Sequence, residues 1–260
     1  MVRSWTYNKR ILLLLPGIFL SLFALSADEI LDIAVPKGYE RIVYPADSFS
    51  GWIQRLPLKA DSKILTHTGK YLTDRMYNRL GVLDLPLLFS EDLEQCADYC
   101  MRMWADYHKE SDQLDSMFLY SYGGEKQYFA SSGLSYIDFL YRAFNYSNTH
   151  SLKAGSLHIE EKAQDGTPNL RPGDMIVQND TGGIGHVSMI VDSSEDESGN
   201  RLYLVGFSFM PAQEFHIEEA VNFPSLDLDF GKEGWFSYEG YLKFLDEFLP
   251  FGEPVPIRFE

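Results

Sequence analysis

The sequence predicts an α+β fold, in which one amphipathic helix lies beside a small antiparallel sheet. The helix is indicated by apolar residues that recur every three or four positions over Leu93–Tyr107. Three short apolar runs with turn residues between them, Met175–Gln178, Val187–Val191 and Arg201–Phe209, indicate strands. The polar segment Asp192–Asn200 has the composition of a hairpin loop, so the last two strands are expected to be antiparallel.

The N-terminus has the pattern of an export signal. Three basic residues precede the apolar run Ile11–Leu25, and Ala24–Ala27 supplies small residues for cleavage. We therefore predict a signal peptide over residues 1–27 and an exported protein, periplasmic or secreted; an uncleaved anchor is the alternative. No linker or repeat divides residues 28–260, which are expected to form a single domain and a monomer without further membrane contact.

Composition limits the partners. The net charge of −16 would repel nucleic acid and anionic lipid, so neither is expected to bind. The chain has 16 Tyr and 18 Phe, which indicates either a groove that stacks on sugars or peptides, or a core rich in aromatic rings. His150 and His158 lack a second ligand at metal spacing, so no metal site and no cofactor are expected.

The two cysteines lie four residues apart on the predicted helix. Ser90 is a candidate N-cap, which would place Cys96 more than one turn inside; a start near Glu94 would bring it to the positive end of the helix dipole. Cys100 falls in the middle of the apolar stripe and is expected to be a buried core thiol. A disulfide within one helix would be strained, so free thiols are expected unless the helix is broken.

The other elements are shorter. Met117–Tyr122 and Lys63–Thr68 are predicted as strands, and Ser135–Phe144 as a second helix. Trp52–Pro57 fits either a strand or one helical turn, and Asn145–Ser156 is predicted to be a turn-rich connector.

Five separated motifs resemble a known bacterial family. They are Gln95–Asp98, Asn148–Leu152, Pro172–Asp174, Gly185–Val187 and Met210–Gln213. In this order they are similar to the family catalogued as domain of unknown function 4846, over the chain from about Trp52 to the C-terminal region. The resemblance implies no particular activity, because that family has no settled one.

A helix-borne cysteine followed by Pro-Gly-Asp and Gly-His-Val also resembles the NlpC-type and amidase-type papain-like hydrolases. The resemblance implies a papain-like arrangement, with Cys96 as nucleophile on the helix and His186 as its base on the sheet. A thiolate–imidazolium pair of this kind attacks a carbonyl at neutral pH without a metal. The expected substrate is an amide or peptide bond, such as that of a cell-wall peptide.

At the position of the residue that would orient the histidine, this sequence departs from the pattern of these hydrolases. Pairing Asp192 with Arg201 across the hairpin would place Phe207 opposite His186, and phenylalanine cannot hold an imidazole tautomer. The related family often carries glutamine there. Ser208 is expected to take this role, with Gln213 or a backbone carbonyl as alternatives.

Two functions follow from these patterns. One is an exported cysteine hydrolase that uses Cys96, His186 and Ser208. The other is a non-catalytic envelope protein of the same fold that binds a glycan or peptide. In either case Asp174, Gln178 and Gln213 are the residues expected to contact the ligand.

Overall fold

The computed structural model describes residues 28–73 and 76–260. The predicted signal peptide over residues 1–27 lies outside the described residues. Within the described parts, no helix combines the length and the apolar character that crossing a bilayer requires.

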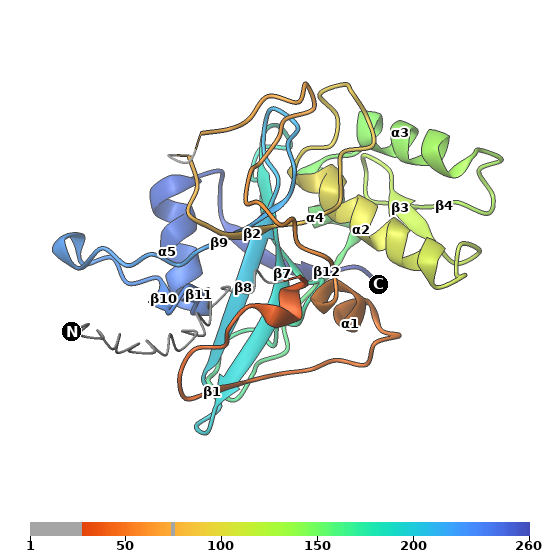
Figure 1. Ribbon diagram of the computed structural model, residues 1–260. Coiled ribbons are helices and arrows are strands. Elements are labelled where there is room, and N and C mark those ends of the chain that lie inside the picture. Colours follow the sequence, from red (N-terminus) through yellow and green to blue (C-terminus); the bar gives the residue numbers. More distant parts are fainter. Residues whose placement is uncertain (1–27, 74–75) are drawn as a thin grey trace, which may run out of the picture.

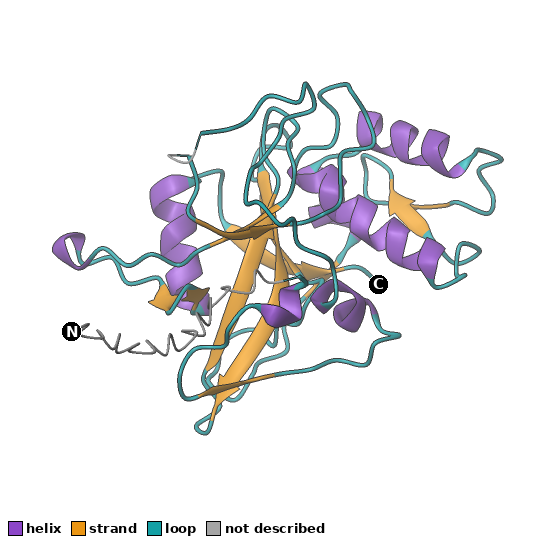
Figure 2. Cartoon of the chain, in the orientation of Figure 1, coloured by secondary structure: helices purple, strands orange, loops and turns teal. Residues whose placement is uncertain are grey.

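Strands occupy the middle of the molecule and helices lie on both sides of them (Figure 2). The main sheet is ten-stranded and its pairings are antiparallel. Along its longest path the order is β10 (Gly231–Lys232), β11 (Trp235–Phe236), β8 (Arg201–Phe207), β7 (His186–Asp196), β6 (Met175–Gln178), β12 (Pro254–Arg258) and β5 (Leu157–His158). Three further strands join it: β1 (Tyr39–Arg41) pairs with β7, β9 (His216–Glu218) with β8, and β2 (Arg79–Val82) with β9. A separate hairpin is formed by β3 (Phe118–Tyr120) and β4 (Lys126–Tyr128).

The helices divide between the two faces of the sheet. They are α1 (Phe49–Gln54), α2 (Cys96–Glu110), α3 (Tyr136–Tyr146), α4 (Thr149–Gly155) and α5 (Tyr238–Phe248), with 3-10 turns η1 (Ile30–Asp32) and η2 (Pro224–Leu226). Figure 1 shows α5 on one side of β7 and β8, and α2, α3 and α4 on the other.

Strand β7 separates two hydrophobic cores. Val187, Met189 and Val191 belong to the core that contains α2, whereas Ile190 belongs to the core that contains α5. Successive side chains of a strand point to opposite faces, so His186 and Ser188 share the face of Ile190. The contact of the His186 ring with Phe207, a member of the α5 core, agrees with this assignment.

The predicted α+β class with an antiparallel sheet is confirmed, and β6 has the expected bounds. The predicted pairing of Asp192 with Arg201 is wrong, because Arg201 is the partner of Glu195 and Asp192 that of Leu204. β7 continues to Asp196 where the polar composition indicated a loop. The reason is that β1 pairs with this part of the strand, and Gln54 from α1 binds the buried carboxylate of Asp192.

Other boundaries also differ from the sequence prediction. Helix α2 begins at Cys96 and not at Ser90, and the predicted connector contains α4. Lys63–Thr68 forms only isolated bridges, through Leu65 and Thr66. The predicted second helix is confirmed as α3, with Ser135 as its N-cap.

The ion pair between Arg41 and Asp192 holds the N-terminal segment on the sheet, and its removal tests the fold. Arg41 Nε lies 2.7 Å from Asp192 Oδ2, and the guanidinium also donates to Leu31 O and Ile33 O. We expect Arg41→Ala to lower the free energy of unfolding by about 3–5 kcal/mol, because it leaves a buried carboxylate without its cation. Denaturant unfolding measures this change.

The matched control is Lys63→Ala, which breaks the exposed 3.7 Å pair with Asp61 and should cost less than about 1 kcal/mol. Equal losses in the two variants would contradict the role given to Asp192.

Candidate ligand site at the start of helix α2

Helix α2 follows a loop that is hydrogen-bonded to the segment after β8. Asp92 Oδ1 accepts a hydrogen bond of 2.6 Å from Ala212 N and one of 3.1 Å from Gln95 Nε2. Gln95 is the N-cap residue, and its backbone N donates to Asp98 Oδ2 at 3.1 Å. Asp92 therefore binds the distant loop at Ala212 and the N-cap side chain, and Cys96 is the first helical residue.

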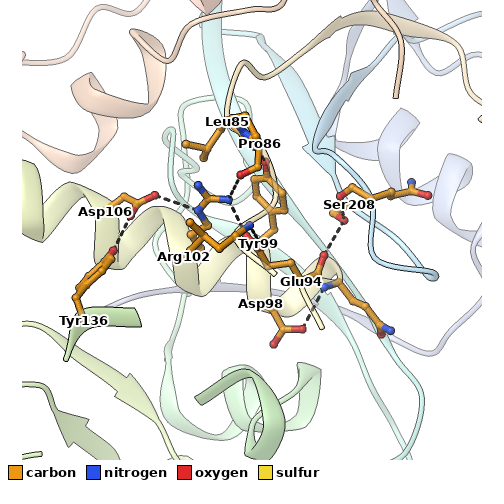
Figure 3. A network of polar contacts seen from close by, with 12 residues as sticks. Leu85, Pro86, Glu94, Asp98, Tyr99, Arg102, Asp106, Tyr136 and Ser208 are labelled. Atoms are coloured by element: carbon orange, nitrogen blue, oxygen red, sulfur yellow. Dashed lines mark hydrogen bonds and ion pairs between the residues drawn. The ribbon is translucent and has the colours of Figure 1, made fainter. Parts of the chain in front are cut away.

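A buried ionic network fixes this start (Figure 3). Arg102 Nη1 lies 2.7 Å from Glu94 Oε1 and donates to Pro86 O at the same distance. Arg102 Nε lies 3.2 Å from Asp106, which in turn accepts a hydrogen bond from Tyr136 of α3. Burial raises the pKa of the Glu94 carboxyl, although Arg102 acts in the opposite direction. The network holds the loop before Cys96 in one arrangement.

A pocket of about 400 Å³ opens beside the first turn of α2. Cys96, Ala97 and Asp98 line one side of it. Asp92, Leu93, Gln95 and Phe144 also line it. The remaining lining residues come from the start of α4, the glycine-rich turn before β7 and the segment after β8: Ser147, Asn148, Thr149, Gly183, Ile184, Gly185, Phe209 and Met210. None of the described residues that line this pocket is basic, and Asp98 Oδ1 is buried without a hydrogen-bond partner among them.

The Cys96 thiol is present at the pocket but is not activated. Its residue is 7% exposed. Burial raises the pKa of the Cys96 thiol to about 11, although the backbone N–H of Val187 favours the thiolate. Both cysteines are free, and burial also raises the pKa of the Cys100 thiol. At neutral pH both sulfurs are therefore protonated.

The structure does not bring His186 to Cys96. The fully buried His186 ring lies among Phe207, Phe209 and Phe251, at centroid distances of 5.1, 5.5 and 6.2 Å. Neither ring nitrogen has a hydrogen-bond partner among the described residues, so neither is bonded to the Cys96 thiol. Burial lowers the pKa of His186 to about 3, so the ring is neutral. The expected pair is not formed because the side chain of Val187, and not that of His186, faces α2.

Ser208 does not orient the histidine. Its buried Oγ donates to Gln213 O at 2.6 Å and lies 3.4 Å from Glu94 O, so both contacts are to backbone carbonyls (Figure 3). Ser208 thus joins the end of β8 to the loop that leads into α2. Its contacts are those of a structural residue.

The three residues expected to contact a ligand do not line the Cys96 pocket. Asp174 forms two 2.6 Å bonds with Arg258 near the start of β6. Gln178 is the Cα partner of His186, and its Nε2 donates to Gly252 O at 2.9 Å. Gln213 Nε2 donates to the Tyr77 hydroxyl at 3.1 Å.

Comparison with known proteins identifies the family. The model of the family described as Domain of unknown function (4846) matches residues 31–131 and 120–241. The chain belongs to this family. No curated protein and no solved structure matched the chain. These comparisons add no support for the resemblance to NlpC-type hydrolases.

Four of the five motifs that resembled the 4846 family meet at the pocket. Gln95–Asp98 supplies its helix, Asn148–Leu152 supplies Asn148 and Thr149, Gly185–Val187 supplies Gly185, and Met210–Gln213 supplies Met210. Sequence reasoning did not name Ser147, Asn148, Thr149 or Phe209 as site residues. Asn148 and Thr149 belong to one of the motifs, and Ser147 and Phe209 each directly precede a motif, which was the available indication. Their meeting depends on α4, in a segment whose composition predicts a connector.

The state of the thiol can be tested with iodoacetamide. A raised pKa leaves little thiolate at neutral pH, so we expect slow alkylation of Cys96 at pH 7 and a rate that increases up to about pH 11. Cys100 should react only after unfolding. Peptide mass spectrometry after timed labelling separates the two sites. Rapid labelling of Cys96 at pH 7 would show that the thiolate is stabilised in solution.

Proposed function

We propose that this member of the 4846 family is an exported, non-catalytic binding domain for a peptidoglycan-like ligand, in which a peptide joins a sugar. The peptide would occupy the Cys96 pocket and the sugar an adjoining hollow. In this proposal the protein is a monomer and does not bind nucleic acid. The observation that carries it is that the two hollows, of about 400 and 340 Å³, share Ser147 in their walls.

The chemistry of the Cys96 pocket suits a peptide. Leu93, Ile184 and Met210 supply apolar contacts, and Asn148 and Gly185 lie among the polar groups of its wall. With carboxyl groups and no basic residue among the described lining, the pocket disfavours anions. Peptide amides with small apolar side chains can satisfy both the polar and the apolar parts of such a wall.

The adjoining hollow suits a sugar. It is lined by the exposed rings of Tyr122 and Tyr146 and by the polar side chains of Glu125, Gln127 and Arg142. A sugar can place its apolar face on a tyrosine ring while its hydroxyl groups bind charged and amide side chains.

The environment of the thiol favours binding over cleavage. A cysteine nucleophile needs a base or a lowered pKa, and Cys96 has neither, because His186 lies on the other face of the sheet and burial raises the thiol pKa. A bound peptide would therefore be retained unchanged.

A papain-like cysteine hydrolase is the second candidate, and one observation favours it. Cys96 is the first residue of a 15-residue helix and lines a pocket, and a helix N-terminus stabilises a thiolate. This function requires a base to reach the sulfur when substrate is bound. It predicts product formation that Cys96→Ala abolishes.

A rim substitution tests the proposed peptide site. Ile184 is 69% exposed, so Ile184→Asp should leave the fold intact. The added carboxylate should weaken binding of a soluble disaccharide–tetrapeptide with amidated carboxyl groups by about tenfold, or about 1.4 kcal/mol, since it removes an apolar contact and adds charge. Isothermal titration calorimetry measures the affinity for this conjugate, and titrations with the free tetrapeptide and the free disaccharide measure the affinity for each half of the ligand.

Leu226→Asp is the matched control, because Leu226 is 67% exposed in η2 and lines neither hollow. Tyr146→Ala should weaken the disaccharide and the conjugate but not the free tetrapeptide. No binding of any of the three probes would refute the proposal, and cleavage that depends on Cys96 would support the hydrolase instead.

A further inference from the structure

A second aromatic pocket lies on the α5 side of the sheet, away from Cys96. Its volume is about 350 Å³, and its walls include Phe207, Phe223, Phe230, Phe244 and Phe248. Phe207, Phe230 and Phe244 belong to the α5 core, whereas Cys96 belongs to the other core. The pocket therefore has no part in the proposed peptidoglycan-like site.

The rings at this pocket are packed against one another. Phe230 contacts Phe223, Phe244 and Phe248 at centroid distances of 6.3, 5.8 and 5.9 Å, and Phe244 contacts Phe248 at 5.2 Å. Phe248 is 48% exposed, so part of this cluster is open to solvent. Aromatic faces carry partial negative charge and attract cations.

Two carboxyl groups complete the wall. Glu218 is only 2% exposed yet lines the pocket, and Glu219 lies beside it. Glu218 Oε1 accepts a 3.1 Å hydrogen bond from Asn78 N, and Oε2 lies 3.1 Å from His216 Nε2. None of the described lining residues is Lys, Arg or His. Packed rings around a buried acid, with no basic group on the described part of the wall, are complementary to an organic cation.

We propose that this pocket binds an organic ammonium group, with Glu218 as its counter-ion and the phenylalanine rings as its walls. A methylated or alkylated ammonium fits better than a metal ion, because the wall offers ring faces and few oxygen ligands. The exposed ring of Phe248 would cover the bound cation.

Electrostatics at Glu218 couple binding to pH. Burial raises the pKa of Glu218 to about 8, with Glu219 acting in the same direction and Arg79 in the opposite one. Burial lowers the pKa of His216 to about 3, so this neighbour is neutral at neutral pH. Among the described residues, the phenols of Tyr77 and Tyr241 are further titratable groups near Glu218, and burial raises the pKa of each.

The sign of the pH dependence follows from these charges. Below about pH 8 the carboxyl of the free protein is protonated, and a cation binds best to the ionised form. Binding must then release a proton, so affinity should increase with pH and level off above about pH 8. Without a ligand, the stability contributed by the neutral Glu218 should decrease as the pH rises from about 4.5 to about 8, because over this window the unfolded state has lost the proton and the folded state still holds it.

Choline and its uncharged isostere 3,3-dimethyl-1-butanol test the proposal on the full chain. We expect choline to bind and the isostere to bind at least about tenfold more weakly, measured by calorimetry from pH 6 to 9. Glu218→Gln should weaken choline binding by at least about tenfold and abolish the pH dependence, which a merely structural role for Glu218 would not do.

Phe248→Ala should weaken choline binding severalfold, and Tyr128→Ala, at an exposed ring outside all of these pockets, should not change it. Equal affinity for choline and its isostere, no choline binding, or an unchanged pH profile in Glu218→Gln would each overturn the proposal. All of these outcomes are independent of ligand binding at the Cys96 pocket.

Discussion

The alternation of side chains along β7 is the constraint on which the rest of the structure depends. The strand is buried on both faces, so its side chains divide between the α2 core and the α5 core. This division sends Val187 toward Cys96 and His186 toward Phe207. Of the two neighbours on the strand, Val187 and not His186 therefore faces α2, and no hydrogen bond joins the imidazole to Cys96. A shift of one residue in the register of this strand would move each of its side chains to the opposite face of the sheet.

Burial on the two faces has different chemical results. On the α2 face, the network of Glu94, Arg102 and Asp106 satisfies its charges internally and leaves a pocket with an inactive thiol. On the α5 face, burial favours the neutral forms of Glu218 and His216. His216 Nε2 lies 3.1 Å from Glu218 Oε2. The first arrangement fixes the shape of a site, whereas the second places an acid whose charge can respond to a ligand.

The acidic character of the chain is consistent with both proposed sites. The net charge is −16, and neither pocket has a basic residue among its described lining. The sites differ in what their apolar parts can contact. The Cys96 pocket mixes a polar helix start with scattered apolar side chains, whereas the α5 pocket surrounds a buried acid with packed rings. Neutral amides suit the first and organic cations the second.

The sequence by itself determined the antiparallel α+β class, strand β6, helix α3 and the buried position of Cys100, because these depend on local periodicity and turn residues. It also indicated the 4846 family through motifs that lie mostly at one pocket. Only the tertiary structure decided that Asp192 lies in a strand, since Arg41 and Gln54 compensate its charge from distant segments. Only the tertiary structure placed Cys96 at a helix start and not Ser90, because the segment between them is held by distant contacts, among them the bond from Ala212 N to Asp92. Which face His186 occupies depends on the packing of α2 and α5 against β7, and that information is spread over the whole chain and is absent from the motif around the histidine.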